Sequence, residues 1–294
     1  MNMSNSLTAI KDGSGRMSRM RRCEIPLLYG KPSDRSITDA KNWTTHLRKV
    51  GRLKISRLPR YCVLSFPYID VGTYLLDSYG ARELKASGEK TPWYFFEHQG
   101  MSVVFAQTGM GAPRAGATLE ELFALRVRYV ILVGGVGVLD SELARWTIMV
   151  PTQAIRDEGT SYHYQTPSIY SFPSPKLLRS IRQVLERDGK RFVEGVVWTT
   201  DAVYRETLEK RDEFARKGAI CVDMEASALF SIARYRRRHV AALFYAGDYV
   251  GEDRWDLRVE KDHEEKKRET AEKLLNVSLD ALHSIWLKEG NPST

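Results

Sequence analysis

The sequence contains few of the residues that build disulfide frameworks and metal centres. It has three cysteines, Cys23, Cys62 and Cys221, which lie far apart and form no Cys-x-x-Cys pair, and only six histidines among 294 residues. An odd number of widely spaced cysteines does not predict a disulfide framework, and the histidines show neither His-x-His nor His-Glu-x-x-His spacing. We therefore expect no bound metal and no cofactor.

Long apolar runs are also missing. The longest uncharged apolar run, residues 129–139, is too short to span a bilayer, and the N-terminal residues are rich in arginine without the apolar stretch of a signal peptide. These features predict a soluble, cytoplasmic protein with no membrane partner. Hydrophobic residues still make up 43% of the chain, which is enough for a buried core in one large domain or two small ones.

The net charge of +8 raises the question of nucleic-acid binding. Its basic clusters are residues 16–22, in a polar leader, and residues 234–238, at the C-terminal end of an expected helix, where cations are favoured. Neither cluster has interleaved aromatic residues or a nucleic-acid-binding signature. We therefore expect no dedicated nucleic-acid partner, although a positive field also attracts phosphate or nucleotides.

Three regions follow one another along the chain. Residues 1–22 read as a mobile leader, and residues 23–60 as an arm with one short helix near 39–50. From residue 61 to 290 the pattern alternates between apolar runs and amphipathic stretches. Strands are expected near 61–66, 102–108, 129–136, 147–155, 193–200, 219–223 and 239–246, and helices near 72–86, 116–126, 174–188, 206–217, 225–236 and 259–287. This alternation predicts a three-layer α/β fold, with a central mixed, mostly parallel sheet flanked by helices.

Two glycine-rich segments are the first candidates for ligand binding. In residues 108–122 a predicted strand leads through Gly109 and Gly111 into a helix, and the run 129–139 passes through Gly134 and Gly135. Such loops offer backbone N–H groups near the positive end of a helix, where an anion or a polar ligand edge is stabilised. A tight turn that needs glycine for its geometry alone would give the same pattern.

Further segments give these loops a family context. The relevant stretches are 108–122, 129–139, 154–164, 199–204 and 219–230. Together, and in the expected order over roughly residues 60–255, they resemble the nucleoside phosphorylase superfamily, which includes purine nucleoside phosphorylases, uridine phosphorylases and nucleosidases. The resemblance implies a nucleoside phosphorylase-like fold, a small nucleoside substrate bound at the four glycines above, and a homo-oligomer, either dimer or hexamer.

Glu225 is the main candidate for binding the sugar. It follows an apolar strand and begins a helix, where a carboxylate is held ionised. The resemblance implies that Met224 and Glu225 line the ribose, with Glu225 accepting hydrogen bonds from the 2′- and 3′-hydroxyls. A carboxylate there also stabilises an oxocarbenium-like transition state. The alternative is a glutamate that only complements the helix dipole.

Asp248 is the candidate acid. It ends the apolar run 239–248, and ligands of open α/β sheets bind at the carboxyl ends of strands. The resemblance aligns it with the aspartate that purine-cleaving members place beside N7 of the base, where a raised pKa would let it donate a proton. An aspartate that merely opens the turn before Gly251 is the alternative.

Weaker candidates lie in two loops. The resemblance implies that Val203 and Tyr204 contact base or sugar, although an aromatic residue there is equally often part of the core. Arg156 and His163 belong to a loop, residues 156–163, that is close to the uridine phosphorylase form of the motif. The alternative is that the polar residues of this loop only pair with one another.

The sequence departs from the family at the phosphate site. Phosphorolytic members carry a Gly-Asp-Pro-x-Arg turn where this chain has residues 65–70, and an arginine and a hydroxyl where it has Leu132 and Gly135. Each charge-assisted bond lost costs roughly 1.5–3 kcal/mol. Arg114, Arg35 or an arginine of a neighbouring subunit is the candidate substitute.

We therefore expect cleavage of the N-glycosidic bond of a nucleoside or related ribosyl compound, with purines favoured and inorganic phosphate as the acceptor. The pyrimidine-reading Gln-x-Arg is replaced by residues 205–208, Arg-Glu-Thr-Leu. Hydrolysis by water is the first alternative, because two phosphate-binding positions are lost. The second is a nucleoside sensor that keeps the sugar site and has no activity.

Overall fold

The computed structural model describes residues 26–28, 32–33, 35–84, 93–252 and 254–290. The predicted leader, residues 1–22, lies outside the described residues, and the boundaries predicted for the arm and the catalytic domain stay predictions. No helix in the described part of the chain is both long and apolar enough to cross a membrane.

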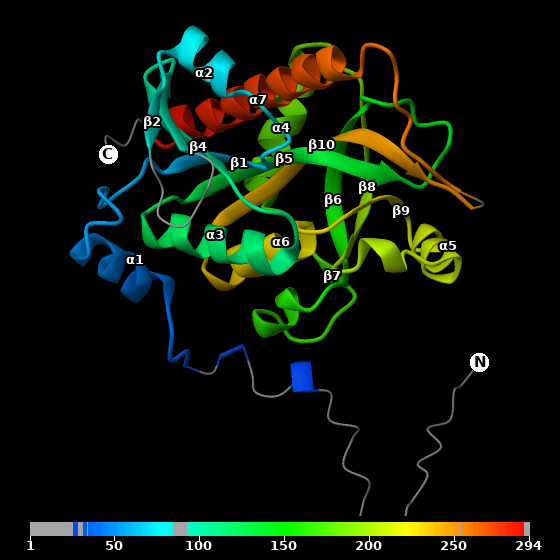
Figure 1. The fold of residues 1–294 in the computed structure, drawn as a ribbon, viewed down its shortest axis with the longest axis horizontal. Helices are drawn as coiled ribbons and strands as arrows, with labels where there is room; N and C mark the ends of the chain where they lie inside the picture. Colours follow the sequence, from blue (N-terminus) through cyan, green and yellow to red (C-terminus); the bar gives the residue numbers. More distant parts are fainter. Residues whose placement is uncertain (1–25, 29–31, 34, 85–92, 253, 291–294) are drawn as a thin grey trace, which may run out of the picture.

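The described strands form one mixed sheet with mostly parallel strands (Figure 1). They are β1 (Tyr61–Ser65), β2 (Arg82–Leu84), β3 (Trp93–His98), β4 (Met101–Gln107), β5 (Tyr129–Val138), β6 (Ile148–Asp157), β7 (Tyr170–Ser171), β8 (Phe192–Thr200), β9 (Ala219–Asp223), β10 (His239–Val250) and β11 (Trp255–Asp256). Strands β4, β1, β5 and β10 run parallel, as do β6, β8 and β9.

Antiparallel pairings join these two parallel groups into a closed ring. Strand β10 pairs with β6, and β5 pairs with β9, while β10 and β5 also pair with each other. The order β10, β6, β8, β9, β5 and back to β10 therefore has no free edge. This closure brings the ends of β5, β9 and β10 to the same place.

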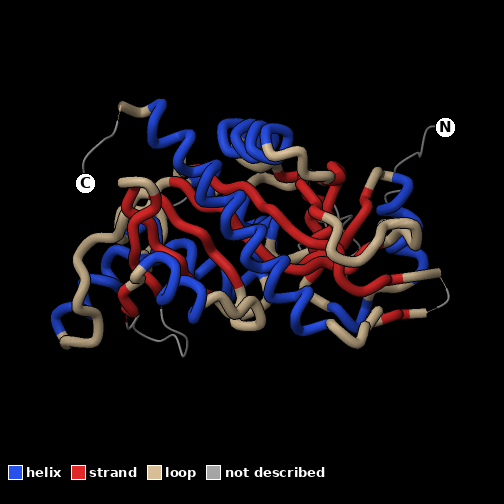
Figure 2. Tube along the Cα trace, turned by 90° about the horizontal axis from the view of Figure 1, so that it is seen from above, coloured by secondary structure: helices blue, strands red, loops and turns tan. Residues whose placement is uncertain are grey.

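Helices cover both faces of the sheet. They are α1 (Ala40–Lys49), α2 (Gly72–Tyr79), α3 (Ala112–Ala124), α4 (Pro175–Arg187), α5 (Leu208–Arg216), α6 (Ala226–Tyr235) and α7 (His263–Lys288), with 3-10 turns η1 (Pro26–Leu28), η2 (Thr160–His163) and η3 (Val203–Arg205). Helices α1, α3 and α6 pack on one side, and α4 and α7 on the other, each side with its own apolar core. Figure 2 shows α7 lying across the strands.

The arm contacts this core through α1 and the segment that follows it. Asp39 caps α1 by accepting the N–H of Asn42, and Leu47 and Leu58 are buried. The N–H of Leu58 donates to the carbonyl of Leu125 at the end of α3. The short helix expected near residues 39–50 is therefore confirmed.

Several element bounds differ from the sequence-based expectation. The helix expected over 72–86 ends at Tyr79, because Gly80 adopts a left-handed conformation, with φ 56°, that closes the helix. Strand β3 was not expected, although its aromatic residues favour a strand. The last helix begins at His263 rather than near 259.

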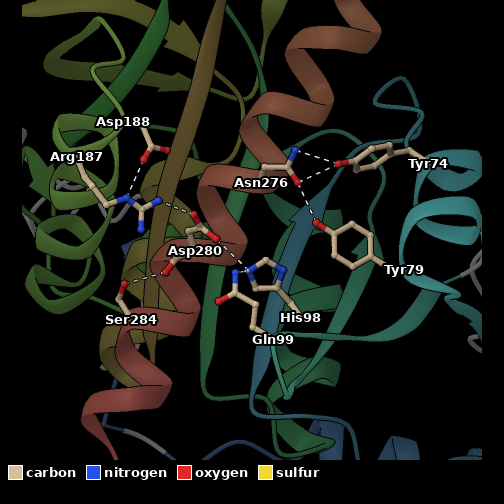
Figure 3. A network of polar contacts seen from close by, with 9 residues as sticks. All are labelled: Tyr74, Tyr79, His98, Gln99, Arg187, Asp188, Asn276, Asp280 and Ser284. Atoms are coloured by element: carbon tan, nitrogen blue, oxygen red, sulfur yellow. Dashed lines mark hydrogen bonds and ion pairs between the residues drawn. The ribbon is translucent and has the colours of Figure 1, made fainter.

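A polar network fastens the elements on the α7 side (Figure 3). The Asp280 carboxylate on α7 lies 3.0 Å from His98 Nε2 of β3 and 2.6 Å from Arg187 of α4. The amide of Asn276 meets the hydroxyls of Tyr74 and Tyr79 from α2. These contacts join α2, β3, α4 and α7, and they lie away from the cleft described next.

Candidate active site

A cleft of about 430 Å³ opens where β5, β9 and β10 come together. Its walls come from the loop after β1, the glycine loop before α3, the segment from η3 to α5, the junction of β9 and α6, and the hairpin of β10 and β11. Such a position, at the carboxyl ends of strands, is where α/β sheets bind ligands. The cleft is therefore our candidate active site.

Glu225 lies between β9 and α6 and is only 6% exposed. Its Oε1 accepts the backbone N–H of Gly111 at 2.5 Å, so the carboxyl is held against the glycine loop. Gly111 adopts φ 94° at this turn, a backbone conformation that favours glycine. Burial, and next the charge of Asp223, raise the pKa of Glu225 to about 8, while the Gly111 N–H opposes the rise. The expectation that the start of the helix holds this carboxylate ionised is therefore wrong, because burial outweighs the helix dipole.

Asp223 ends β9 and is buried beside Glu225. Its Oδ1 accepts the Thr199 hydroxyl at 2.6 Å, and its Oδ2 accepts the N–H groups of Glu225 and Ala226 at 3.1 and 2.7 Å. Burial raises the pKa of Asp223 to about 6 in spite of these donors. The sequence analysis did not assign Asp223 a role, although it directly precedes Met224 and Glu225.

Asp248 lines the cleft from within β10, which runs two residues beyond it. The strand end expected at Asp248 is therefore wrong. The register of β10 against β5 shifts between Ala246 and Tyr249, and such a bulge redirects a side chain. Gly247 allows it, because a Cβ there would lie 3.1 Å from the carbonyl oxygen of Val136. Trp255 of β11 donates its Nε1–H to Asp248 Oδ2 at 2.5 Å.

Glu206 is a cleft residue that sequence reasoning missed as a candidate. It follows η3 and lines the cleft together with Asp248. Burial, and next the charge of Asp248, raise the pKa of Glu206 to about 7. A like-charged neighbour disfavours ionisation of Glu206, so this carboxyl keeps its proton closer to neutral pH. The available signal was a carboxylate two residues after Tyr204, in the segment predicted to contact the substrate.

The structure brings some of the other predicted residues to the cleft. Met224, Gly135, Val203 and Tyr204 line it, and Tyr204 is 85% exposed at its rim. The assignment of these residues to substrate binding stays a prediction.

The structure places other predicted residues next to the cleft or away from it. A Cβ on Gly134 would lie 2.9 Å from the Phe66 ring, and one on Gly109 would lie 3.0 Å from Cγ of Arg114, so both glycines permit close packing. Neither glycine lines the cleft, and neither does Arg114. Their assigned roles in binding stay predictions.

Arg156 and His163 are directed elsewhere. The Arg156 guanidinium is buried in its own loop, where it donates to the Ser161 hydroxyl at 2.8 Å and to the carbonyls of Thr166 and Gln165 at 2.9 and 3.1 Å. His163 lines a separate groove that also contains Arg35, between α1, α3 and η2. Arg156 therefore pairs within its own loop, as the alternative interpretation predicted.

Acidic residues outnumber basic residues in the lining of the cleft. Five carboxylate residues line it, namely Glu206, Asp223, Glu225, Asp248 and Glu252. The two cationic residues that line it, Arg211 and Arg254, both have partners. Arg211 donates to the carbonyls of Leu139 and Val250 at 2.8 and 3.1 Å and lies 3.5 Å from Glu252, while Arg254 lies 3.8 Å from Asp256.

The N–H groups of Gly111 and Gly135, in the two predicted glycine-rich segments, also have acceptors in the protein. The Gly111 N–H donates to Glu225, and the Gly135 N–H donates to the Tyr68 hydroxyl at 3.3 Å. Among the described residues, no group of three or more metal-ligating side chains is gathered.

Comparison with known proteins agrees with this architecture. Residues 70–282 match the family model of the phosphorylase superfamily. The chain belongs to this superfamily. It is 25% identical over 194 residues to the guanosine phosphorylase of Halorubrum lacusprofundi, which covers 64% of this chain and 78% of the relative.

Solved structures share the fold of this phosphorylase superfamily member. A uridine phosphorylase from Vibrio fischeri matches with a TM-score of 0.67 at 22% identity, over 77% of this chain and 92% of that one. An AMP nucleosidase from Bacteroides thetaiotaomicron matches with a TM-score of 0.65 at 24% identity, over 85% of this chain and 97% of that one. The predicted α/β fold, with a mixed and mostly parallel sheet between helices, is therefore confirmed.

Proposed function

We propose that this protein cleaves the N-glycosidic bond of a purine nucleoside and uses water as the acceptor. The choice of acceptor rests on two backbone N–H groups that already have acceptors within the protein. Glu225 and Tyr68 take the N–H groups of Gly111 and Gly135, which would otherwise face a phosphate. A phosphate dianion would also find both arginine residues that line the cleft already paired with other groups. Water carries no charge and therefore needs no unpaired cation.

Glu225 is assigned to the ribose. Its carboxyl is fixed beside the glycine loop, next to Met224, and can accept hydrogen bonds from two sugar hydroxyls once it is ionised. The same charge stabilises the positive sugar that forms as the bond to the base breaks. This contact strengthens in the transition state and so accelerates the reaction.

Glu206 and Asp248 are assigned to the base. Asp248 accepts the indole N–H of Trp255, and burial together with the charge of Asp248 favours the protonated form of Glu206. Glu206 therefore carries a proton near neutral pH, which can be delivered to a purine nitrogen as the base departs. The absence of a Gln-x-Arg pair after η3 is the reason for preferring purines.

Phosphorolysis is the second candidate, and the sequence analysis placed it first. The name of the Halorubrum lacusprofundi relative, which is a guanosine phosphorylase, favours it. Phosphate would then have to displace Tyr68 from Gly135 and recruit an arginine such as Arg114.

A nucleoside panel tests the proposal. Inosine, guanosine, adenosine, uridine and AMP are incubated with the protein, with and without phosphate, and free base is measured by chromatography. We expect base release from a purine nucleoside in phosphate-free buffer. Release that requires phosphate would establish phosphorolysis instead. Binding without release from any member of the panel would identify a sensor.

A further inference from the structure

Glu225 occupies an unusual place for a residue that faces a ligand. It is the N-cap residue of α6, and the side chain of an N-cap residue ordinarily accepts an N–H of its own helix. The Glu225 side chain makes no such bond and reaches across to Gly111 instead. Another group must therefore satisfy the first N–H groups of α6.

Asp223 supplies that group from two residues upstream. Its Oδ2 accepts the N–H of Glu225 and the N–H of Ala226, the first residue of α6. Its Oδ1 accepts the hydroxyl of Thr199, which belongs to the neighbouring strand β8. The Asp223 carboxylate is thus oriented from two sides by groups that are themselves buried.

Thr199 completes the arrangement from β8. Its Oγ1 donates to Asp223 and accepts the N–H of Ser227, the second residue of α6, at 3.0 Å. Thr199 is fully buried and Asp223 is 7% exposed, so water does not replace either partner. The first turn of α6 is therefore capped by Asp223 and Thr199 together, and Glu225 is released from capping.

We propose that Asp223, oriented by Thr199, is a positioning residue that takes over the capping of α6 so that the Glu225 carboxyl faces the substrate. The inference rests on the proposed function, in which Glu225 holds the ribose. Asp223 also has an electrostatic effect, because its charge opposes ionisation of Glu225. Replacing it by asparagine keeps the size of the side chain and removes this charge.

Three variants separate positioning from simple stability. Asp223→Asn lowers the pKa of Glu225, so the rise of kcat/KM with pH should move at least about half a unit lower, with a loss of about tenfold or more in kcat. Thr199→Val leaves Asp223 Oδ1 and the Ser227 N–H without partners and should lower kcat similarly. Thr199→Ser restores the hydroxyl and should recover most of the activity.

Ser171→Ala is the matched control. Ser171 is equally buried and donates to the carbonyl of Ser227, so its loss disturbs the same helix without touching Asp223. We expect its kcat and pH profile to stay close to those of the wild type. An unmoved pH profile in Asp223→Asn, or equal losses of kcat in Ser171→Ala and Thr199→Val, would overturn the proposal.

Hydrogen exchange of the Gly111 amide gives a readout that needs no substrate. This N–H is protected by Glu225, so we expect faster exchange in Asp223→Asn and Thr199→Val and unchanged exchange in Ser171→Ala. Unchanged protection in the first two variants would refute positioning. If the wild-type protein released no base from any nucleoside while this exchange pattern held, the proposed function would fail and the positioning of Glu225 would stand.

Discussion

Glu225 lies where burial and the neighbouring Asp223 both oppose ionisation, and its pKa is raised to about 8. The folded protein therefore binds this proton more tightly than the unfolded chain does. The resulting stabilisation is complete below the ordinary pKa of 4.5 and is lost as the pH rises through about 8. The Glu225 carboxyl in the cleft therefore lowers the free energy of unfolding at alkaline pH.

Glu225→Gln should consequently be the more stable protein at high pH. The amide carries no charge, so we expect its free energy of unfolding to exceed that of the wild type by up to a few kcal/mol at about pH 9 and by much less at about pH 5. Activity should fall by about tenfold to a hundredfold, because a transition-state contact is lost. Urea denaturation at both pH values, with base release at pH 7, checks both parts. Wild-type turnover would remove Glu225 from the site.

The pair of Glu206 and Asp248 predicts a dependence on the leaving group. Substrates with poor leaving groups need the proton that Glu206 loses as the pH rises through about 7, so their rate should fall there relative to the rate of activated substrates, which share the dependence on Glu225. Asp248→Asn and Glu206→Gln should each slow these substrates far more than activated ones, and Glu206→Gln should abolish the fall above pH 7. Equal losses on both substrate types would assign the two residues structural roles.

At the scale of elements, the C-terminal end of α7 is held by a cluster around Glu289. Its carboxylate accepts the Tyr129 hydroxyl and Lys176 Nζ, and it lies 3.3 Å from an Arg60 nitrogen and from the Tyr61 hydroxyl. Burial alone would raise the pKa of Glu289, but these partners stabilise the carboxylate and lower the pKa to about 2. The stabilisation is therefore present above the ordinary pKa of 4.5 and is lost as the pH falls through about 2.

Glu289→Gln should lower the free energy of unfolding by about 1–3 kcal/mol at pH 7, because two tyrosines and two cations lose a charged acceptor. Glu269→Gln, on an exposed position of the same helix, is the control and should change stability by less than about 0.5 kcal/mol. Thermal unfolding of the two variants at pH 7 and pH 3 makes the comparison. Equal stabilities would show that packing alone fastens α7.

The bounds of elements were predictable where a strong apolar run met a clear stop signal. The strands around Val63 and Ile131 fit this description, as does the helix that begins near Pro175. The bulge that carries Asp248 was not predictable, because it arises from pairing between β10 and β5. Glu206 was missed for a related reason, since its burial depends on residues that lie far away in the sequence.

At the scale of the whole molecule, the closed ring of strands determines which residues meet. The sequence analysis gathered Met224, Glu225 and Asp248 through a family resemblance, and the structure places them around one cleft. It also grouped Arg156 with the binding residues, and the structure buries that guanidinium in its own loop. Pairing of a charged group with its own loop depends on backbone geometry, which the order of residues does not reveal.

The proposed acceptor also belongs to this scale, because both arginine residues that line the cleft are already paired with other groups. We expect a phosphate requirement that is partial at most, with measurable base release in phosphate-free buffer. Arg114→Ala, beside Gly109, should reduce any remaining stimulation by phosphate. Initial rates over a phosphate titration measure this. Strict dependence with tight saturation, unchanged in Arg114→Ala, would mean that another arginine, from this chain or a neighbouring subunit of the predicted dimer or hexamer, completes the site.

The residues assigned to the base and those assigned to the sugar lie on different structural elements. Those assigned to the base lie in the hairpin of β10 and β11 and directly after η3. Those assigned to the sugar are positioned by β8, β9 and the start of α6. On the proposed assignment, we therefore expect mutations around Trp255 to change which base is released without disturbing the capped turn that holds Glu225. We expect a lineage built on this plan to exchange one nucleobase for another over evolutionary time while its sugar chemistry is inherited unchanged.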